Sequence, residues 1–223
     1  MKVSEALATR KSVRAFKPDP VPAGTIRAIL EQAARAPSGG NLQPWKVYAL
    51  LGDARDELVR RVAERRKEKA MGELPEYHIY PPGLTEPYKT RRFRIGEAMY
   101  ATMNIPREDK MARLGFFQGN WEFFGAPVGL IFTIDRQMQQ GQWSDLGMYL
   151  QSIMLLAREY GLHTCPQEAW AVWHSVIRDY LSVPENEMIF CGMAIGHADE
   201  SHPVNGLVSE RAPLEEYAKI LGA

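Results

Sequence analysis

The chain has 223 residues, of which 45% are hydrophobic and 24% charged, with 27 basic and 27 acidic residues and a formal net charge of zero. This composition is typical of one sizeable globular domain. Without a basic excess, general binding to nucleic acid or to a membrane surface is not expected. Two cysteines are too few for a disulfide framework, no Cys/His cluster has zinc spacing, and no apolar run is long enough for a membrane helix. We therefore expect a cytoplasmic protein.

Helical and extended patterns alternate along the first third of the chain. Residues 3–9 and 24–36 carry apolar side chains at helical spacing, and three prolines between residues 18 and 22 separate these two predicted helices. Residues 45–51 alternate as a strand does, and residues 53–69 return to the helical period. The order of these elements predicts helices packed on a sheet.

Residues 71–125 have the least regular pattern, and residues 71–88 alone hold four prolines and three tyrosines. A long irregular segment inside a compact domain is usually functional or disordered. We therefore expect a substrate-access lid within residues 71–125. Arg91, Arg92 and Arg94 could attract an acidic substrate to it, although a solvated basic turn explains these arginines almost as well.

The second half of the chain contains the strongest signals for buried elements. Residues 127–135 and 188–195 are apolar enough for buried strands, and residues 213–221 predict a short terminal helix. Residues 142–160 predict a helix that is apolar on almost every side and must therefore be buried all round. In a small domain, part of its surface then packs on another subunit; a central core helix in a monomer is the alternative. These elements predict an α+β fold with helices packed on a mixed sheet.

A basic motif, Arg-Lys-Ser-Val-Arg-Ala-Phe, occupies residues 10–16. Arg10, Lys11 and Arg14 offer cationic side chains, and Ser12 adds a hydroxyl. Cationic side chains of this kind form charge-assisted hydrogen bonds to a phosphate group. By itself, such a run is more often a solvated helix face.

A glycine motif, Pro-Ser-Gly-Gly-Asn-Leu-Gln-Pro-Trp, occupies residues 37–45. Its two adjacent glycines have no side chain, so the backbone there can approach a flat group closely. Its amide side chains offer hydrogen-bond donors and acceptors. By itself, this stretch is usually only a loop. The basic motif and the glycine motif together suggest a phosphorylated heteroaromatic cofactor.

Both motifs resemble those of the nitroreductase family of FMN-dependent flavoproteins. Residues 107–110 and 141–148 resemble its nitrobenzoate-reductase-like branch. The family motifs read Arg-(Arg/Lys/His)-Ser-(Val/Ile)-Arg-x-Phe and Pro-Ser-x-x-Asn-x-Gln-Pro-Trp. A third match runs from residues 192–197 to residues 210–214, where the family places its last strand and a phosphate-binding arginine. The resemblance extends over essentially the whole chain. It implies one FMN-binding domain over residues 1–223, with a mixed sheet flanked by helices, assembled as an intertwined homodimer.

The resemblance also implies a role for each matching residue. Arg10, Arg14 and Arg211 would bind the FMN phosphate, and backbone amides near Glu168 and Ala169 would approach the reactive N5 edge of the ring. The complete set of residues expected at the cofactor is Arg10, Lys11, Ser12, Arg14, Pro37, Ser38, Gly39, Asn41, Asn120, Pro166, Glu168, Ala169 and Arg211.

The implied activity is the reduction of nitroaromatic or other electron-poor rings by NADPH or NADH. The flavin would carry the chemistry, so no catalytic side chain and no metal is expected, and one stacking site for donor and acceptor implies a ping-pong mechanism. Phe123, Phe124 and Tyr88 are the expected contacts of a small aromatic acceptor. Cys165 lacks the base that a nucleophile needs. Two alternatives are a reductive dehalogenase of the iodotyrosine-deiodinase type and an FMN-binding protein without turnover.

Overall fold

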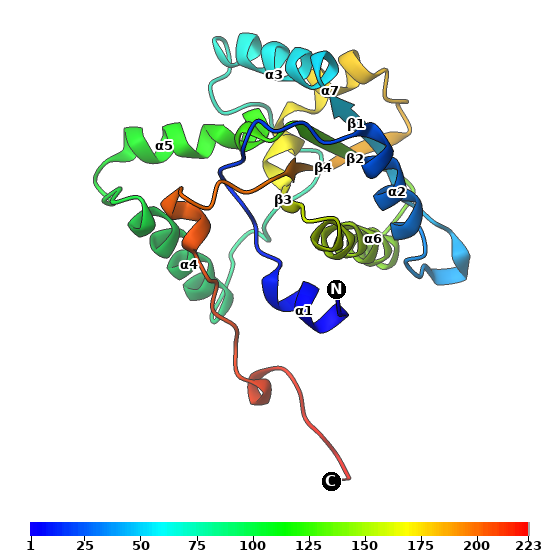
Figure 1. The fold of residues 1–223 in the computed structure, drawn as a ribbon, viewed down its shortest axis with the longest axis vertical. Helices are drawn as coiled ribbons and strands as arrows, with labels where there is room; N and C mark the ends of the chain where they lie inside the picture. Colours follow the sequence, from blue (N-terminus) through cyan, green and yellow to red (C-terminus); the bar gives the residue numbers. More distant parts are fainter. Residues whose placement is uncertain (223) are drawn as a thin grey trace.

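The computed structural model describes residues 1–222, and its centre is a four-stranded sheet in the order β1-β2-β4-β3 (Figure 1). The strands are β1 (Lys46–Leu51), β2 (Val128–Asp135), β3 (His163–Gln167) and β4 (Glu187–Gly196). All three neighbouring pairs are antiparallel. The predicted α+β architecture is confirmed. The sheet of this chain is not mixed, because its parallel component within residues 1–222 is one isolated bridge between Ser12 and Thr164.

Seven α-helices and five short 3-10 segments surround the sheet within the described residues. The helices are α1 (Val3–Thr9), α2 (Ala23–Ala33), α3 (Asp53–Arg66), α4 (Tyr88–Thr102), α5 (Lys110–Gln118), α6 (Gln140–Glu159) and α7 (His174–Leu181). The 3-10 segments are η1 (Gly39–Asn41), η2 (Gly119–Gly125), η3 (Glu168–Trp173), η4 (Pro203–Gly206) and η5 (Leu214–Glu216).

Side chains of β2 alternate between two apolar clusters, one on each face of the sheet. Leu130, Phe132 and Ile134 join the cluster built with α2 and α6, whereas Ile131 joins the cluster built with α3 and α7. This alternation follows from the two-residue period of a strand. Because helices cover both faces, β2 and β4 are buried along almost their whole length.

Helix α6 is buried on the face that meets the sheet. Leu146, Tyr149 and Ile153 lie in the α2–α6 cluster, but the side chain of Met148 is 38% exposed. The sequence predicts a helix that is buried on all sides, but within this chain only one face of α6 is buried. The remaining apolar surface is free to contact another molecule.

The segment predicted as a lid is more regular than its sequence suggests. Residues 88–102 and 110–118 are α4 and α5, which project from the body as a hairpin and contain no buried residue (Figure 1). Neither helix has a sustained apolar stripe, which is why periodicity did not reveal them. Tyr77 belongs to the scaffold, because its ring stacks on Phe190 at 5.3 Å and its hydroxyl donates to the Phe190 carbonyl at 2.6 Å.

The C-terminal residues leave the body as an extended arm (Figure 1). The predicted helix over residues 213–221 is wrong, since only η5 is helical there. Tyr217 is 71% exposed and Ile220 is 74% exposed, so no apolar face is packed, and short helices depend on such packing. Within residues 1–222 no helix has the length and apolar character needed to cross a membrane.

Candidate functional site

The basic motif is an extended segment that lies beside β3. The Val13 amide donates to the Thr164 carbonyl at 3.0 Å, and the Phe16 amide donates to the Phe124 carbonyl at 3.2 Å. The side chains of Val13 and Phe16 are buried in the cluster beneath. Their burial fixes the backbone and leaves the four polar residues of the motif half-buried at the surface, where a ligand can reach them.

A buried asparagine that sequence reasoning missed holds this segment in place. The Asn205 Oδ1 accepts from the Arg14 amide at 2.9 Å, and its Nδ2 donates to the Ala15 and Asp199 carbonyls at 2.8 and 2.9 Å. The Lys11 ammonium donates to the Asn205 backbone carbonyl. Asn205 thus joins the basic motif to the segment that follows β4. An asparagine in a turn gave no signal of this role.

Arg10 and Arg211, from opposite ends of the chain, lie close enough to repel each other. Burial, and then the charge of Arg211, lower the pKa of Arg10. Arg211 is held by the Ser209 hydroxyl at 2.6 Å and by the Glu210 carbonyl at 2.8 Å. Within the described residues no carboxylate forms an ion pair with Arg10. Arg10, Ser12 and Arg14 on one segment, with the charge of Arg211 added from the C-terminal arm, make a position where an oxyanion is favoured.

The glycine motif is held by α6. The Gly39 amide donates to Oδ2 of Asp145, a buried carboxylate, at 3.2 Å, and the Ser38 hydroxyl accepts from the Gln43 amide at 3.0 Å. Gly40 and Asn41 have φ values of 57° and 56°, a left-handed conformation that glycine and asparagine tolerate. Residues 39–41 are exposed, so their backbone is open to a flat ligand.

The end of β3 meets the segment around Asn120. The Gln167 Nε2 donates to the Asn120 carbonyl at 2.8 Å, and the Trp121 indole donates to the Ala169 carbonyl at 2.9 Å. Partial desolvation raises the pKa of Glu168, although much of its surface remains exposed. The structure therefore groups Asn120 with the predicted residues at 166–169.

Cys165 lies just before this region and is not poised as a nucleophile. Its thiol is buried, and burial raises its pKa to about 11. A thiol at that pKa is almost wholly protonated near neutral pH. Among residues 1–222 no group of three or more His, Cys, Asp or Glu side chains is placed to hold a metal ion.

The three predicted acceptor contacts lie in different environments. Phe123 is fully buried and stacks on Trp170 with ring centroids 4.4 Å apart, so its ring belongs to the core and does not face a binding surface. Phe124 is half-buried, and Tyr88 is 58% exposed at the start of α4. The sequence did not reveal the burial of Phe123, because Phe123 and Phe124 are adjacent residues of the same type and no periodic pattern distinguishes them.

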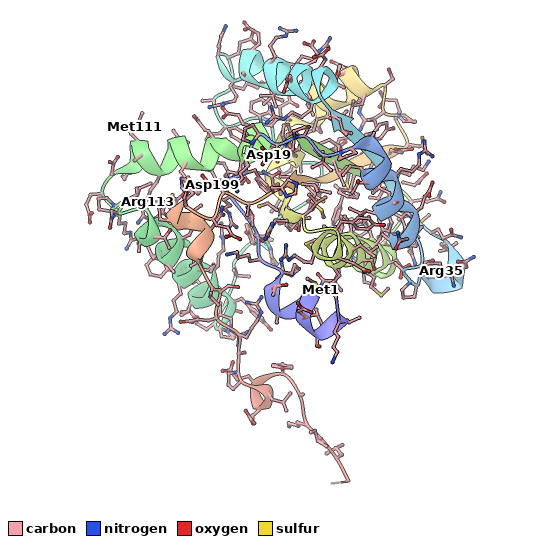
Figure 2. All side chains as sticks on the ribbon, in the orientation of Figure 1. Met1, Asp19, Arg35, Met111, Arg113 and Asp199 are labelled. Carbon is pink, nitrogen blue, oxygen red and sulfur yellow. The ribbon has the colours of Figure 1, made fainter. Side chains whose placement is uncertain are left out.

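One chain does not bring the two motifs together. Arg158, near the end of α6, donates to the Thr9 hydroxyl at 3.3 Å beside the basic motif, whereas Asp145 holds the glycine motif near the start of the same helix. A rise of 1.5 Å per residue separates these anchors by about 20 Å. Figure 1 shows residues 10–16 and the loop after α2 on opposite sides of α6, and Figure 2 places Arg35, just before that loop, at the margin opposite Arg113.

Comparisons with known proteins show the family and the fold of this chain. A model of the Nitroreductase family matches residues 7–197. Chloronitrobenzene nitroreductase of Comamonas testosteroni is 37% identical over 219 residues, which cover 96% of this chain and 95% of that protein. The FMN and NADPH-dependent nitroreductase NfnB from Sphigopyxis sp. strain HMH has a TM-score of 0.96 at 47% identity, with full coverage of both chains. The FMN-dependent nitroreductase NfnB from Mycobacterium smegmatis, solved in complex with NADPH, has a TM-score of 0.89 at 32% identity, covering 98% of this chain and 97% of that one.

We predict that Asn205→Ala loosens the basic motif. The substitution leaves the Arg14 amide and the Ala15 carbonyl without their partners, which costs about 1–3 kcal/mol of unfolding free energy. Hydrogen exchange should show faster exchange of the Arg14 amide, and urea denaturation should show the lower stability. Asn186→Ala, which removes an exposed side chain, is the matched control. Unchanged exchange at Arg14 would contradict the role assigned to Asn205.

Proposed function

Because this chain belongs to the Nitroreductase family, we propose that it is an FMN-dependent oxidoreductase that uses NADPH or NADH to reduce nitroaromatic or other electron-poor aromatic compounds. The observation that carries the proposal is the basic motif itself, in which Asn205 holds the backbone and Arg10, Ser12 and Arg14 lie half-buried at the surface. The charge of Arg211, on the C-terminal arm, reaches the same place and contributes, after burial, to the lowered pKa of Arg10. The repulsion between these cations is relieved when a phosphate binds between them. The residues present therefore fit the cofactor that the family implies.

Each half of the site suits a different part of FMN. Arg10, Ser12, Arg14 and Arg211 would hold the phosphate through charge-assisted hydrogen bonds. The exposed backbone of residues 38–41 would approach the edge of the ring system. Residues 166–169, beside Asn120, would cover its reactive edge. Lys11, whose ammonium donates to the Asn205 carbonyl, positions the motif and keeps two further N–H donors for the cofactor.

The chain itself has only to position the reactants. When bound, FMN would accept a hydride from the nicotinamide and pass reducing equivalents to the acceptor, and this is why the site needs no nucleophile. Buried Asp145 and Asn205 fix the two motifs. A single stacking site for donor and acceptor supports ping-pong kinetics. The acceptor would be a small flat aromatic compound, with Tyr88 and Phe124 as the remaining candidate contacts.

We further propose a homodimer in which each FMN is held by the basic motif of one subunit and the glycine motif of its partner. The distance between the motifs along α6 supports this arrangement, because one chain alone provides only half of each site. The extended arm exposes Tyr217 and Ile220, and no residue of the α4–α5 hairpin is fully buried within this chain. Such apolar surfaces mark interaction sites.

The lid proposed within residues 71–125 is best placed beyond the anchored Tyr77, over residues 78–87 and the α4–α5 hairpin. Residues 78–87 are mostly exposed and contain no helix or strand. A cytoplasmic location stays a prediction from composition and from two free cysteines.

The activity is tested by the spectrum and turnover of the purified full-length protein. A bound flavin should give its visible absorption bands, and NADPH oxidation should depend on an added nitroarene. A protein without flavin would contradict the proposal, and a flavin-loaded protein without turnover would favour the non-catalytic alternative. Deiodination of iodotyrosine at a higher rate than nitroarene reduction would favour the dehalogenase.

Arg10→Gln should weaken FMN binding while leaving the cofactor-free protein as stable as the parent or more stable, because it removes the repulsion with Arg211. A charge-assisted hydrogen bond is worth about 1.5–3 kcal/mol, so FMN affinity should fall by about tenfold or more. Flavin fluorescence titration and thermal unfolding of both forms measure the two effects. Arg27→Gln, on the exposed face of α2, is the control. Equal FMN affinity would remove Arg10 from the phosphate site.

Met148→Glu should impair the dimer. Met148 projects from α6 without contributing to either core cluster, so a charge there leaves the fold intact but opposes an apolar interface. Sedimentation analysis should show a shift towards monomer, together with loss of flavin. Gln151→Glu, on the same helix, tests whether charge on α6 is sufficient. A parent protein that is monomeric with full flavin content would end the proposal of a shared site.

A further inference from the structure

A cavity of about 630 Å³ lies between α4 and the C-terminal arm. One wall carries Arg91, Arg92 and Arg94, and the other carries Arg211. We propose that this cavity binds the adenosine 2′-phosphate of NADPH and so makes the enzyme prefer NADPH over NADH. The inference rests on the proposed function, because it names the electron donor of the same site.

The charges in the cavity fit a phosphomonoester. Its lining contains four arginines and two glutamates, Glu210 and Glu216. Since Arg211 is assigned to the FMN phosphate, the α4 arginines are the cations that remain for a second anion. Glu216 is already paired with Arg91. Within residues 1–222 Arg94 forms no ion pair and its side chain makes no hydrogen bond, so it can turn towards a ligand. A phosphomonoester carries about two negative charges near neutral pH, whereas a carboxylate carries one and is satisfied by a single arginine.

The cavity also has the shape for a nucleoside. The Arg92 guanidinium lies over the Tyr80 ring, with its carbon 3.9 Å from the ring centroid. In this stacked position the guanidinium keeps its N–H edge free for an anion and presents its second face to a flat base. Ile95, Val208 and Pro213 add apolar surface. The volume falls within the range of small-molecule sites and is generous for a single substituted benzene ring.

The cavity adjoins the predicted FMN phosphate site without duplicating it. Arg211 lines the cavity and lies near Arg10, so the two sites share one wall. Arg10, Ser12 and Arg14, which would hold the FMN phosphate, do not line the cavity. A dinucleotide anchored here would therefore lie beside the flavin, and its nicotinamide end could extend to the ring.

The test compares the two nucleotides in the flavin-loaded double variant Arg92→Gln, Arg94→Gln, with Arg27→Gln as control. We expect kcat/KM for NADPH to fall by about ten- to a hundredfold on loss of two charge-assisted contacts, and kcat/KM for NADH to stay within about twofold. Calorimetry should show that adenosine 2′,5′-bisphosphate binds the parent more tightly than adenosine 5′-monophosphate does, and that the variant loses this difference.

Several results would overturn the inference. Equal losses with NADPH and NADH, or unchanged kinetics with both, would remove the 2′-phosphate from the cavity. Loss of bound FMN from the variant would assign these arginines to the flavin site. A selective loss with 4-nitrobenzoate against nitrobenzene, at fixed NADH, would show that the cavity holds the acceptor's carboxylate. A parent without any NADPH- or NADH-driven turnover would count against the proposed function, and the calorimetric comparison would still decide whether the cavity discriminates the 2′-phosphate.

Discussion

Helices cover both faces of the β2–β4 pair, and the burial of these two strands sets the positions of the elements around them. Helices α2 and α6 cover one face of the two central strands, and α3 and α7 cover the other, so apolar side chains are buried on both faces. Backbone hydrogen bonds pair β2 with β4. β3 then forms one edge, and the basic motif lies beside it through the Val13–Thr164 hydrogen bond. The packing of the core therefore determines where the candidate phosphate site lies.

Two buried polar side chains connect this core to the exposed motifs. Asn205 binds the backbone of the basic motif, and Asp145 binds the backbone of the glycine motif. Buried polar groups are costly unless they are hydrogen-bonded, so each of them holds its loop in one arrangement. The ligand-facing residues can then remain exposed or repulsive, as Arg10 and Arg211 are, because the stability of the loops does not depend on them.

The surfaces that this chain leaves without partners share one explanation. The exposed side of α6, the α4–α5 hairpin and the C-terminal arm all carry apolar groups that the single chain does not cover. A second copy of the chain would complete the half-site at each end of α6, and it would cover the exposed apolar surfaces around this helix. The same arrangement would bring the α4 arginines and the arm into the surroundings of the cofactor, where a dinucleotide must bind.

The amino-acid sequence alone predicts the elements and motifs whose signals are local. Alternation located β1, continuous apolar runs located β2 and β4, and the spacing of Arg10, Ser12 and Arg14 indicated a phosphate site, because such patterns need no knowledge of distant residues. The irregular pattern of residues 88–118 concealed two helices, since neither has a buried residue within this chain and neither therefore carries an apolar stripe. The burial of Phe123 but not of Phe124, and the hydrogen bonds by which Asn205 holds the basic motif, became visible in the folded chain alone. Each of these depends on contacts between residues far apart in the chain, and no local pattern records such contacts.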